Sequence, residues 1–161
     1  MPARWIIFRV ICILQIVAAG FLLVLSFMSL FNTGFFSGFA RIVSLLFCIS
    51  LSIFGINTLN NNYPETPITG RQKSSFNILF LVNFLLLAFL FSFFFSQLTY
   101  VKELSRLSGK NFFDLPTRFY MSLYLYACVI LFQLIILYGL FTLRKEIYGN
   151  FVSRKFEFEK H

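Results

Sequence analysis

The sequence predicts an all-α membrane protein, an antiparallel four-helix transmembrane bundle with short connections. Its 161 residues contain long apolar stretches, each close to the ~20 residues that cross a hydrocarbon core about 30 Å thick. The composition agrees, because 58% of the residues are hydrophobic and 12% are charged, against about 25% charged in average soluble domains. The predicted spans cover approximately residues 5–31, 42–59, 76–95 and 120–143.

In the first span, 5–31, the apolar run continues unbroken from Phe21 to Phe31, which favours a retained helix over a cleaved signal peptide. A short connection follows at 32–41, where Gly34 and Gly38 suit a tight turn. Arg41 ends this connection, so we expect its charge to lie outside the second span.

The second span, 42–59, carries small residues spaced four, four and three apart, which places them on one face of a helix. Small residues allow helices to approach each other closely in lipid. We expect this face to pack against another span of the same chain, with a partner subunit as the alternative. The face consists of Ser44, Cys48, Ser52 and Gly55.

The second connection, 57–75, is the most polar segment and is long for a connection between packed helices. Two prolines hold it extended, and Tyr63 offers an aromatic side chain of the kind that interfaces favour. This segment is the predicted docking surface for a partner, with a solvated connector as the alternative. Ser74 or Ser75 is expected to cap the third span. The predicted docking surface consists of Asn62, Tyr63, Pro64, Glu65, Thr66, Pro67, Thr69, Gly70 and Arg71.

The third span, 76–95, is expected to continue as a helix beyond the apolar stretch. Leucine and valine recur at helical spacing from 98 to 107, and Gly109 then ends the extension. Pro116 marks the approach to the fourth span, 120–143.

Two regions follow from this division: a membrane domain at 1–145 and a short charged cytoplasmic tail at 146–161. Charged residues alternate with phenylalanine at 155–160. Such alternation favours an edge strand only where another strand pairs with it, and a frayed terminus is the alternative.

The placement of charge predicts the topology. An even number of spans puts both termini on one side, together with nine of the Lys and Arg residues, against five on the other side. The positive-inside rule then favours cytoplasmic termini, and we expect a bacterial cytoplasmic (inner) membrane. Cations beside span ends also explain the net charge of +8 through contact with anionic lipid, so nucleic-acid binding is not expected.

Catalytic and cofactor-binding machinery is not expected. The only histidine, His161, is the last residue, which argues against haem, zinc and histidine-based catalysis in the membrane. All six carboxylates fall in connections or the tail, so an ion-coupled transporter is also not expected. The three cysteines form no Cys-x-x-Cys pair. We therefore predict no enzyme activity, no metal and no cofactor.

Neutral polar side chains lie at a similar depth in the spans, roughly 10–15 Å from the cytoplasmic ends. They can serve as hydrogen bonds between helices or as a polar path through the bundle. We expect the three amides among them to point into the bundle. This predicted polar layer consists of Gln15, Ser50, Ser52, Asn83 and Gln133.

The sequence thus indicates a small polytopic membrane protein without catalytic machinery. The first hypothesis is an accessory or structural subunit of a membrane assembly, and the alternative is a small channel or facilitator that uses the polar layer. The expected partners are the lipid bilayer and either another membrane protein or further copies of the chain.

Overall fold

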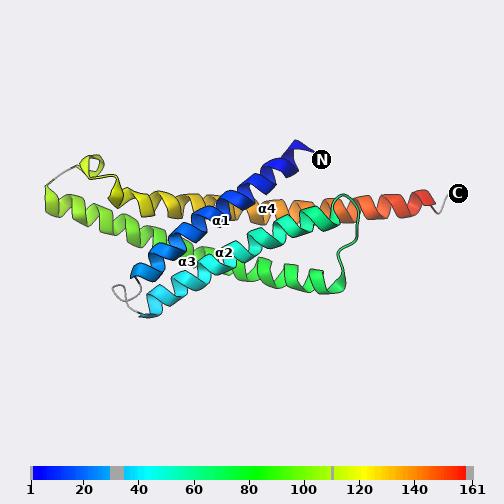
Figure 1. The fold of residues 1–161 in the computed structure, drawn as a ribbon, viewed down its shortest axis with the longest axis horizontal. Coiled ribbons are helices and arrows are strands. Elements are labelled where there is room, and N and C mark those ends of the chain that lie inside the picture. Colours follow the sequence, from blue (N-terminus) through cyan, green and yellow to red (C-terminus); the bar gives the residue numbers. More distant parts are fainter. Residues whose placement is uncertain (1, 30–34, 110, 159–161) are drawn as a thin grey trace.

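The computed structural model describes residues 2–29, 35–109 and 111–158. They form the helices α1 (Ala3–Ser29), α2 (Phe35–Asn62), α3 (Gly70–Ser108) and α4 (Arg118–Phe158), with a short 3-10 turn, η1, at Phe112–Asp114. None of the described residues belongs to a strand. The predicted fold class, a four-helix bundle, is therefore confirmed (Figure 1).

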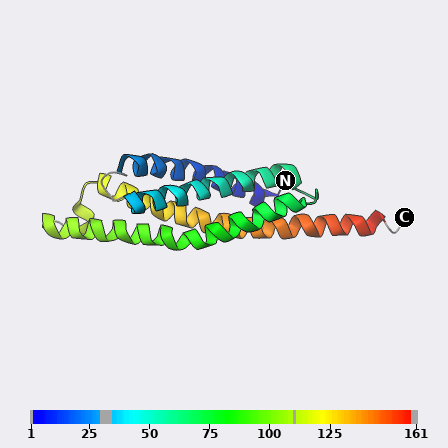
Figure 2. The same cartoon turned by 90° about the horizontal axis from the view of Figure 1, so that it is seen from below.

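Successive helices run antiparallel, so the two termini and the α2–α3 connection lie at one end of the bundle (Figures 1 and 2). We call this the termini end and the opposite one the distal end. α1 and α3 each pack against α2 and α4, and α2 and α4 also contact each other. The core therefore lies along the α2–α4 pair, with α1 and α3 flanking it.

α3 begins earlier than predicted because Thr69 caps it. The Thr69 hydroxyl accepts a hydrogen bond from the Gln72 amide at 3.4 Å, and Gln72 Oε1 accepts one from the Thr69 amide at 2.9 Å. This capping box satisfies backbone amides upstream of Ser74 and Ser75, so the prediction that a serine caps the helix is wrong. The predicted end is confirmed, because Gly109 has a left-handed φ of 65°.

α4 is one helix of 41 residues that passes through the predicted boundary at 145 without a break. Residues 146–158 are helical, so the edge strand or frayed end expected at 155–160 is wrong for 155–158, while 159–161 lie outside the described residues. The end of α4 projects past the other helices at the termini end (Figure 2). Contacts of Tyr63, Pro64 and Glu65 in the α2–α3 connection hold this extension.

α2 also begins earlier than predicted. It starts at Phe35, so Gly38 and Arg41 are helical rather than part of a turn, and Gly34 lies outside the described residues. At 1.5 Å per residue, Arg41 lies about 9 Å inside the helix. Its side chain is buried, which contradicts the expectation of a charge outside the span.

The predicted packing face of α2 points into the bundle. A methyl group added at Gly55 would lie 3.2 Å from Phe8 Cζ of α1, and one added at Gly139 of α4 would lie 2.5 Å from Phe8 Cδ2. The Phe8 ring therefore occupies a notch between two glycines. Packing within the chain, rather than onto a partner, uses this face of α2. Its buried members are Ser44, Cys48, Ser52 and Gly55.

The outer surface of the bundle is apolar. Each of the four helices contains a segment long and apolar enough to cross a membrane. Large apolar side chains such as Val17, Leu85 and Leu131 are exposed on their outer faces. Lipid, rather than water, solvates such faces, and helices satisfy their own backbone hydrogen bonds within it. The chain is an integral membrane protein.

Candidate functional sites

Three side-chain amides from three helices form one hydrogen-bonded chain inside the bundle. Gln15 of α1 donates to Gln133 of α4, with 3.1 Å between Nε2 and Oε1. Gln133 donates in turn to Asn83 of α3, with 2.7 Å between Nε2 and Oδ1, and Asn83 donates to the Leu79 carbonyl at 2.8 Å. All three side chains are fully buried. The prediction that they point into the bundle is confirmed, and we call them the amide chain.

The two serines of the predicted polar layer do not join the amide chain. Ser52 is buried but donates to the Cys48 carbonyl of its own helix at 2.9 Å, and Ser50 donates likewise to the Leu46 carbonyl at 2.9 Å. Ser50 is exposed and lines a shallow groove between α2 and α3. Two residues along a helix turn a side chain to nearly the opposite face, so equal depth does not place both serines at one site.

The amide chain has the properties of a packing device. It contains no ionisable group, and its members do not line the cavities at the termini end, beside Arg41 or between α2 and α3. Gln15 Oε1 accepts no hydrogen bond from the described residues, but the Cys48 thiol of α2 lies beside this side chain. Hydrogen bonds between membrane helices contribute about 0.6–1.7 kcal/mol each. The chain thus links helices across the core.

A second polar cluster surrounds Glu146 at the termini end. Its carboxylate accepts hydrogen bonds from Arg4 at 2.8 Å, from the Tyr63 hydroxyl at 3.2 Å and from the Trp5 indole at 3.5 Å. Burial and the adjacent Glu146 carboxylate raise the pKa of Tyr63 above its ordinary value of 10.0. The hydroxyl therefore keeps its proton and remains a donor. We call these four residues the Glu146 cluster.

The predicted docking surface is bound by α4 of the same chain. Besides the contact of Tyr63 with Glu146, the Pro64 carbonyl accepts a hydrogen bond from Asn150 at 2.8 Å. Glu65 forms an ion pair with Arg154. Tyr63 is thus not the free aromatic anchor that the sequence indicated, because the helical extension of α4 already occupies it.

The rest of the predicted docking surface is organised by Asn62 and by the Thr69 cap. Asn62 is buried, and its side chain donates to the carbonyls of Thr66 at 3.3 Å and Pro67 at 3.4 Å. These bonds fold the connection onto the end of α2. Its exposed members are Pro64, Thr66, Pro67, Thr69, Gly70 and Arg71.

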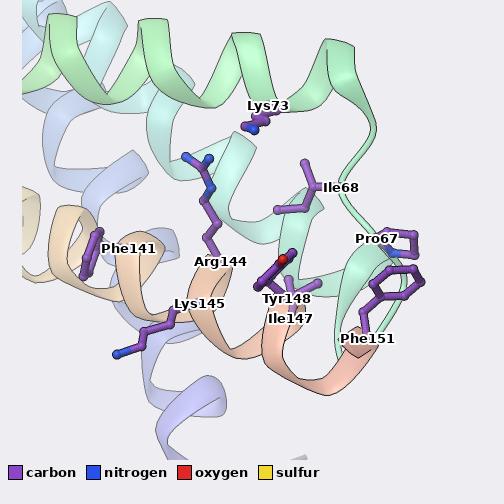
Figure 3. Close-up of a pocket in the computed structure, with 9 residues that line it drawn as sticks. All are labelled: Pro67, Ile68, Lys73, Phe141, Arg144, Lys145, Ile147, Tyr148 and Phe151. Carbon is purple, nitrogen blue, oxygen red and sulfur yellow. The ribbon is translucent and has the colours of Figure 1, made fainter. Parts of the chain in front are cut away.

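A cavity of about 620 Å³ lies between this connection, the start of α3 and the extension of α4 (Figure 3). Cationic and aromatic side chains line it together, and none of the described residues along it is a carboxylate. Arg144 points from α4 toward α3, where it donates to Asn77 Oδ1 at 2.9 Å and lies 4.9 Å from the Phe76 ring centre. We call this cavity the basic groove. It is lined by Pro67, Ile68, Lys73, Phe141, Arg144, Lys145, Ile147, Tyr148 and Phe151.

Sequence reasoning missed the basic groove because it ended the fourth span at 143. Phe141, Arg144, Tyr148 and Phe151 are spaced three, four and three apart, which is the spacing of one helical face. That signal is present in the sequence once the helix is allowed to continue into the predicted tail.

Neither the metal-ligand types among the described residues nor similarity to known proteins assigns a chemistry to these sites. In the described ranges, no three His, Cys, Asp or Glu side chains gather in a position to hold a metal ion. No family model, no curated protein and no solved structure matches this chain. The function therefore has to be inferred from the sites themselves.

Proposed function

We propose that this chain is a non-enzymatic accessory or structural subunit of a membrane assembly and that the basic groove is its docking site. The partner that fits is a membrane protein with an acidic segment that also carries an apolar or aromatic side chain. The observation that carries this proposal is the combination of positive charge and exposed aromatic rings in one groove of about 620 Å³.

Charge supports an acidic partner. Lys73, Arg144 and Lys145 line the groove, and no described carboxylate there neutralises them. Complementary charge across an interface speeds association and selects the partner. Arg144 is already held by Asn77 and Phe76, so its ordering costs less on binding.

Exposed aromatic rings support a protein partner. Tyr148 is 70% exposed and Phe151 is 37% exposed, and both lie beyond the cation pair at 144–145. Large apolar side chains exposed outside the lipid core mark interaction surfaces. Tyrosine and arginine are also the residue types that contribute most to binding energy at interfaces.

The groove has a fixed shape. The Glu146 cluster and the contacts of Asn150 and Arg154 tie the α2–α3 connection to the α4 extension. Pro67 and Ile68 of this connection face the side of α4 that carries Tyr148 and Phe151 (Figure 3). A preorganised surface of this kind loses little entropy when a partner binds.

Site-specific photocrosslinking in native membranes tests the proposal. A photoreactive amino acid placed at Tyr148 should give one discrete protein adduct, identified by mass spectrometry. The matched control is Tyr124, which is also on α4 and 59% exposed but lies toward the distal end, and it should not give that adduct. Lys73→Glu together with Lys145→Glu should reduce the yield about tenfold, because both substitutions repel an acidic partner.

Three outcomes would contradict the proposal. Adducts with lipid alone would make the groove a lipid site. The same adducts from both positions would mean that the groove is not selective. An adduct of twice the mass of the chain would identify a second copy, rather than an acidic partner, as the occupant.

We also infer that the termini end faces the cytoplasm of a bacterial inner membrane, because a four-span topology assigns nine of the Lys and Arg residues in the sequence to the side of the termini and five to the other side. Single cysteines at Thr66 and at Ser108 lie in the α2–α3 connection and at the end of α3, respectively. In intact cells, a membrane-impermeant thiol reagent should label the cysteine at 108 and not the one at 66. The reverse pattern would invert the topology.

A further inference from the structure

A buried cation lies near the distal end of the bundle, and no ion pair joins it to any carboxylate that the structure describes. Arg41 of α2 is only 9% exposed, and its guanidinium carbon lies 5.3 Å from the centre of the Phe93 ring of α3. Within the described part of the chain, Arg41 forms no ion pair, and its Nε has no hydrogen-bond partner.

Such burial is unfavourable unless something compensates the charge. The guanidinium group of an arginine carries a permanent positive charge in proteins. Removing an ion from water costs much more free energy in proteins than a contact with one aromatic ring returns. The Phe93 contact alone therefore does not balance the burial of Arg41.

Arg41 faces a cavity of about 210 Å³ to which all four helices contribute. Ser122 donates to Gln97 Oε1 at 3.1 Å, which orients the Gln97 amide and leaves its NH₂ group as a donor. Tyr126 lines the same cavity. The described residues that line the cavity are Leu22, Leu25, Ser26, Arg41, Gln97, Ser122 and Tyr126.

We propose that this cavity binds a small anionic group, no larger than a phosphate, through Arg41, Gln97 and Tyr126. The guanidinium fork matches two oxygens of one oxyanion, and no described carboxylate lines the cavity to compete for the charge. The volume is below the ~300 Å³ of pockets for drug-sized ligands. A free inorganic anion and the phosphate of a phospholipid headgroup share this chemistry.

Arg41 differs from Arg106, an ordinary surface arginine at the same end of the bundle. Arg106 on α3 is 77% exposed and pairs with Glu103 at 3.2 Å. It therefore serves as the matched control for every effect of salt that does not involve the cavity.

Thermal unfolding of the purified chain in lipid-free nonionic detergent tests the proposal. Sodium gluconate is replaced stepwise by sodium phosphate at constant ionic strength. The Tm of the wild type should rise by about 4 °C at saturating phosphate, because a ligand that binds the folded state stabilises it. Arg41→Gln should abolish this shift, and Arg106→Gln should retain it.

Equilibrium dialysis with labelled phosphate provides a second measurement. The wild type and Arg106→Gln should bind about one phosphate per chain, and Arg41→Gln should bind none. If Arg41→Gln does not fold, Arg41→Lys and Gln97→Leu replace it, and each should weaken binding about tenfold, because one loses the fork and the other a donor.

A parallel titration with phosphatidylglycerol in mixed micelles distinguishes the two sources of the anion. A Tm shift with lipid but not with inorganic phosphate would identify a headgroup, and a shift with inorganic phosphate would identify a free anion. Either result supports the site if Arg41→Gln removes it. No shift with either ligand, or an equal shift in Arg41→Gln, would overturn the proposal.

Discussion

The amide chain and the Arg41 cavity are both polar features of an apolar bundle, but they differ in how their groups are satisfied. In the amide chain, hydrogen bonds of 3.1 Å and 2.7 Å join α1, α4 and α3, and the side chains are fully buried. In the Arg41 cavity, a permanent charge borders about 210 Å³ of open space. Buried groups that hydrogen-bond to one another across helices stabilise a fold, whereas a buried charge that pairs with none of the described carboxylates indicates a ligand site.

The largest effect is expected from Gln133→Leu, which breaks the amide chain at its centre. It removes two interhelical hydrogen bonds and leaves Asn83 Oδ1 without a donor, so the free energy of unfolding should fall by about 3 kcal/mol. Denaturant titration in detergent, followed by circular dichroism, measures the loss. Ser50→Ala is the control, because the exposed Ser50 hydroxyl donates to the Leu46 carbonyl of its own helix. Equal losses in both variants would remove the distinction between the amide chain and the other polar residues.

Gly139→Ala tests whether the helices are closely packed where the Phe8 ring lies against α4. The added methyl group would lie 2.5 Å from the Phe8 ring, and overpacking of this kind costs about 2 kcal/mol. In Gly20→Ala, the methyl group meets nothing within 4 Å. This control should be unchanged or stabilised by up to about 1 kcal/mol, because alanine is the better helix former. If both substitutions behave alike in the same titration, Phe8 does not occupy a tight notch.

Glu146→Gln tests the Glu146 cluster, whose polar groups also hydrogen-bond to one another. It weakens the contacts with Arg4 and Tyr63, but Arg4 is 64% exposed, so the global loss should be only about 1 kcal/mol. The effect should concentrate in the α4 extension and appear as faster proteolysis between 146 and 158. Glu103→Gln, which removes an exposed pair on α3, should leave the cleavage rate unchanged. Unaltered proteolysis of Glu146→Gln would mean that other contacts hold the extension.

The smallest effect, and the opposite sign, is expected from Arg41→Met in phosphate-free gluconate buffer. Replacing a buried charge by an apolar side chain of similar length should leave stability unchanged or raise it by about 1 kcal/mol. The same denaturant titration measures it beside Gln133→Leu. A loss comparable to that of Gln133→Leu would show that protein groups already satisfy Arg41.

The sequence predicted the fold class and the interior position of the amides for clear physical reasons. Four apolar runs of membrane length leave few alternatives to a bundle. Gln15, Asn83 and Gln133 lie at similar depths, and lipid disfavours an exposed amide, so they turn inward and meet. Ser50 was placed with them wrongly, because a hydroxyl can bond to its own helix and face outward.

Both cavities were missed because helix ends depend on tertiary contacts. A charged residue beside an apolar run usually marks the end of a span, which is why Arg41 was assigned to a connection. In the structure, α3 and α4 extend past this level and enclose it. The predicted boundary at 145 likewise separated the residues of α4 that line the basic groove. Residues 146–158 make contacts with distant partners such as Tyr63 and Pro64. Local sequence patterns do not reveal such partners.

The most direct test of the difference between the two regions is the phosphate-induced Tm shift measured side by side in three proteins. Gln133→Leu should unfold at a lower temperature than the wild type and keep the full shift of about 4 °C. Arg41→Gln should unfold near the wild-type temperature in gluconate and show no shift. If Gln133→Leu loses the shift while Arg41→Gln keeps it, the assignment of structure to the amide chain and of binding to the Arg41 cavity is contradicted.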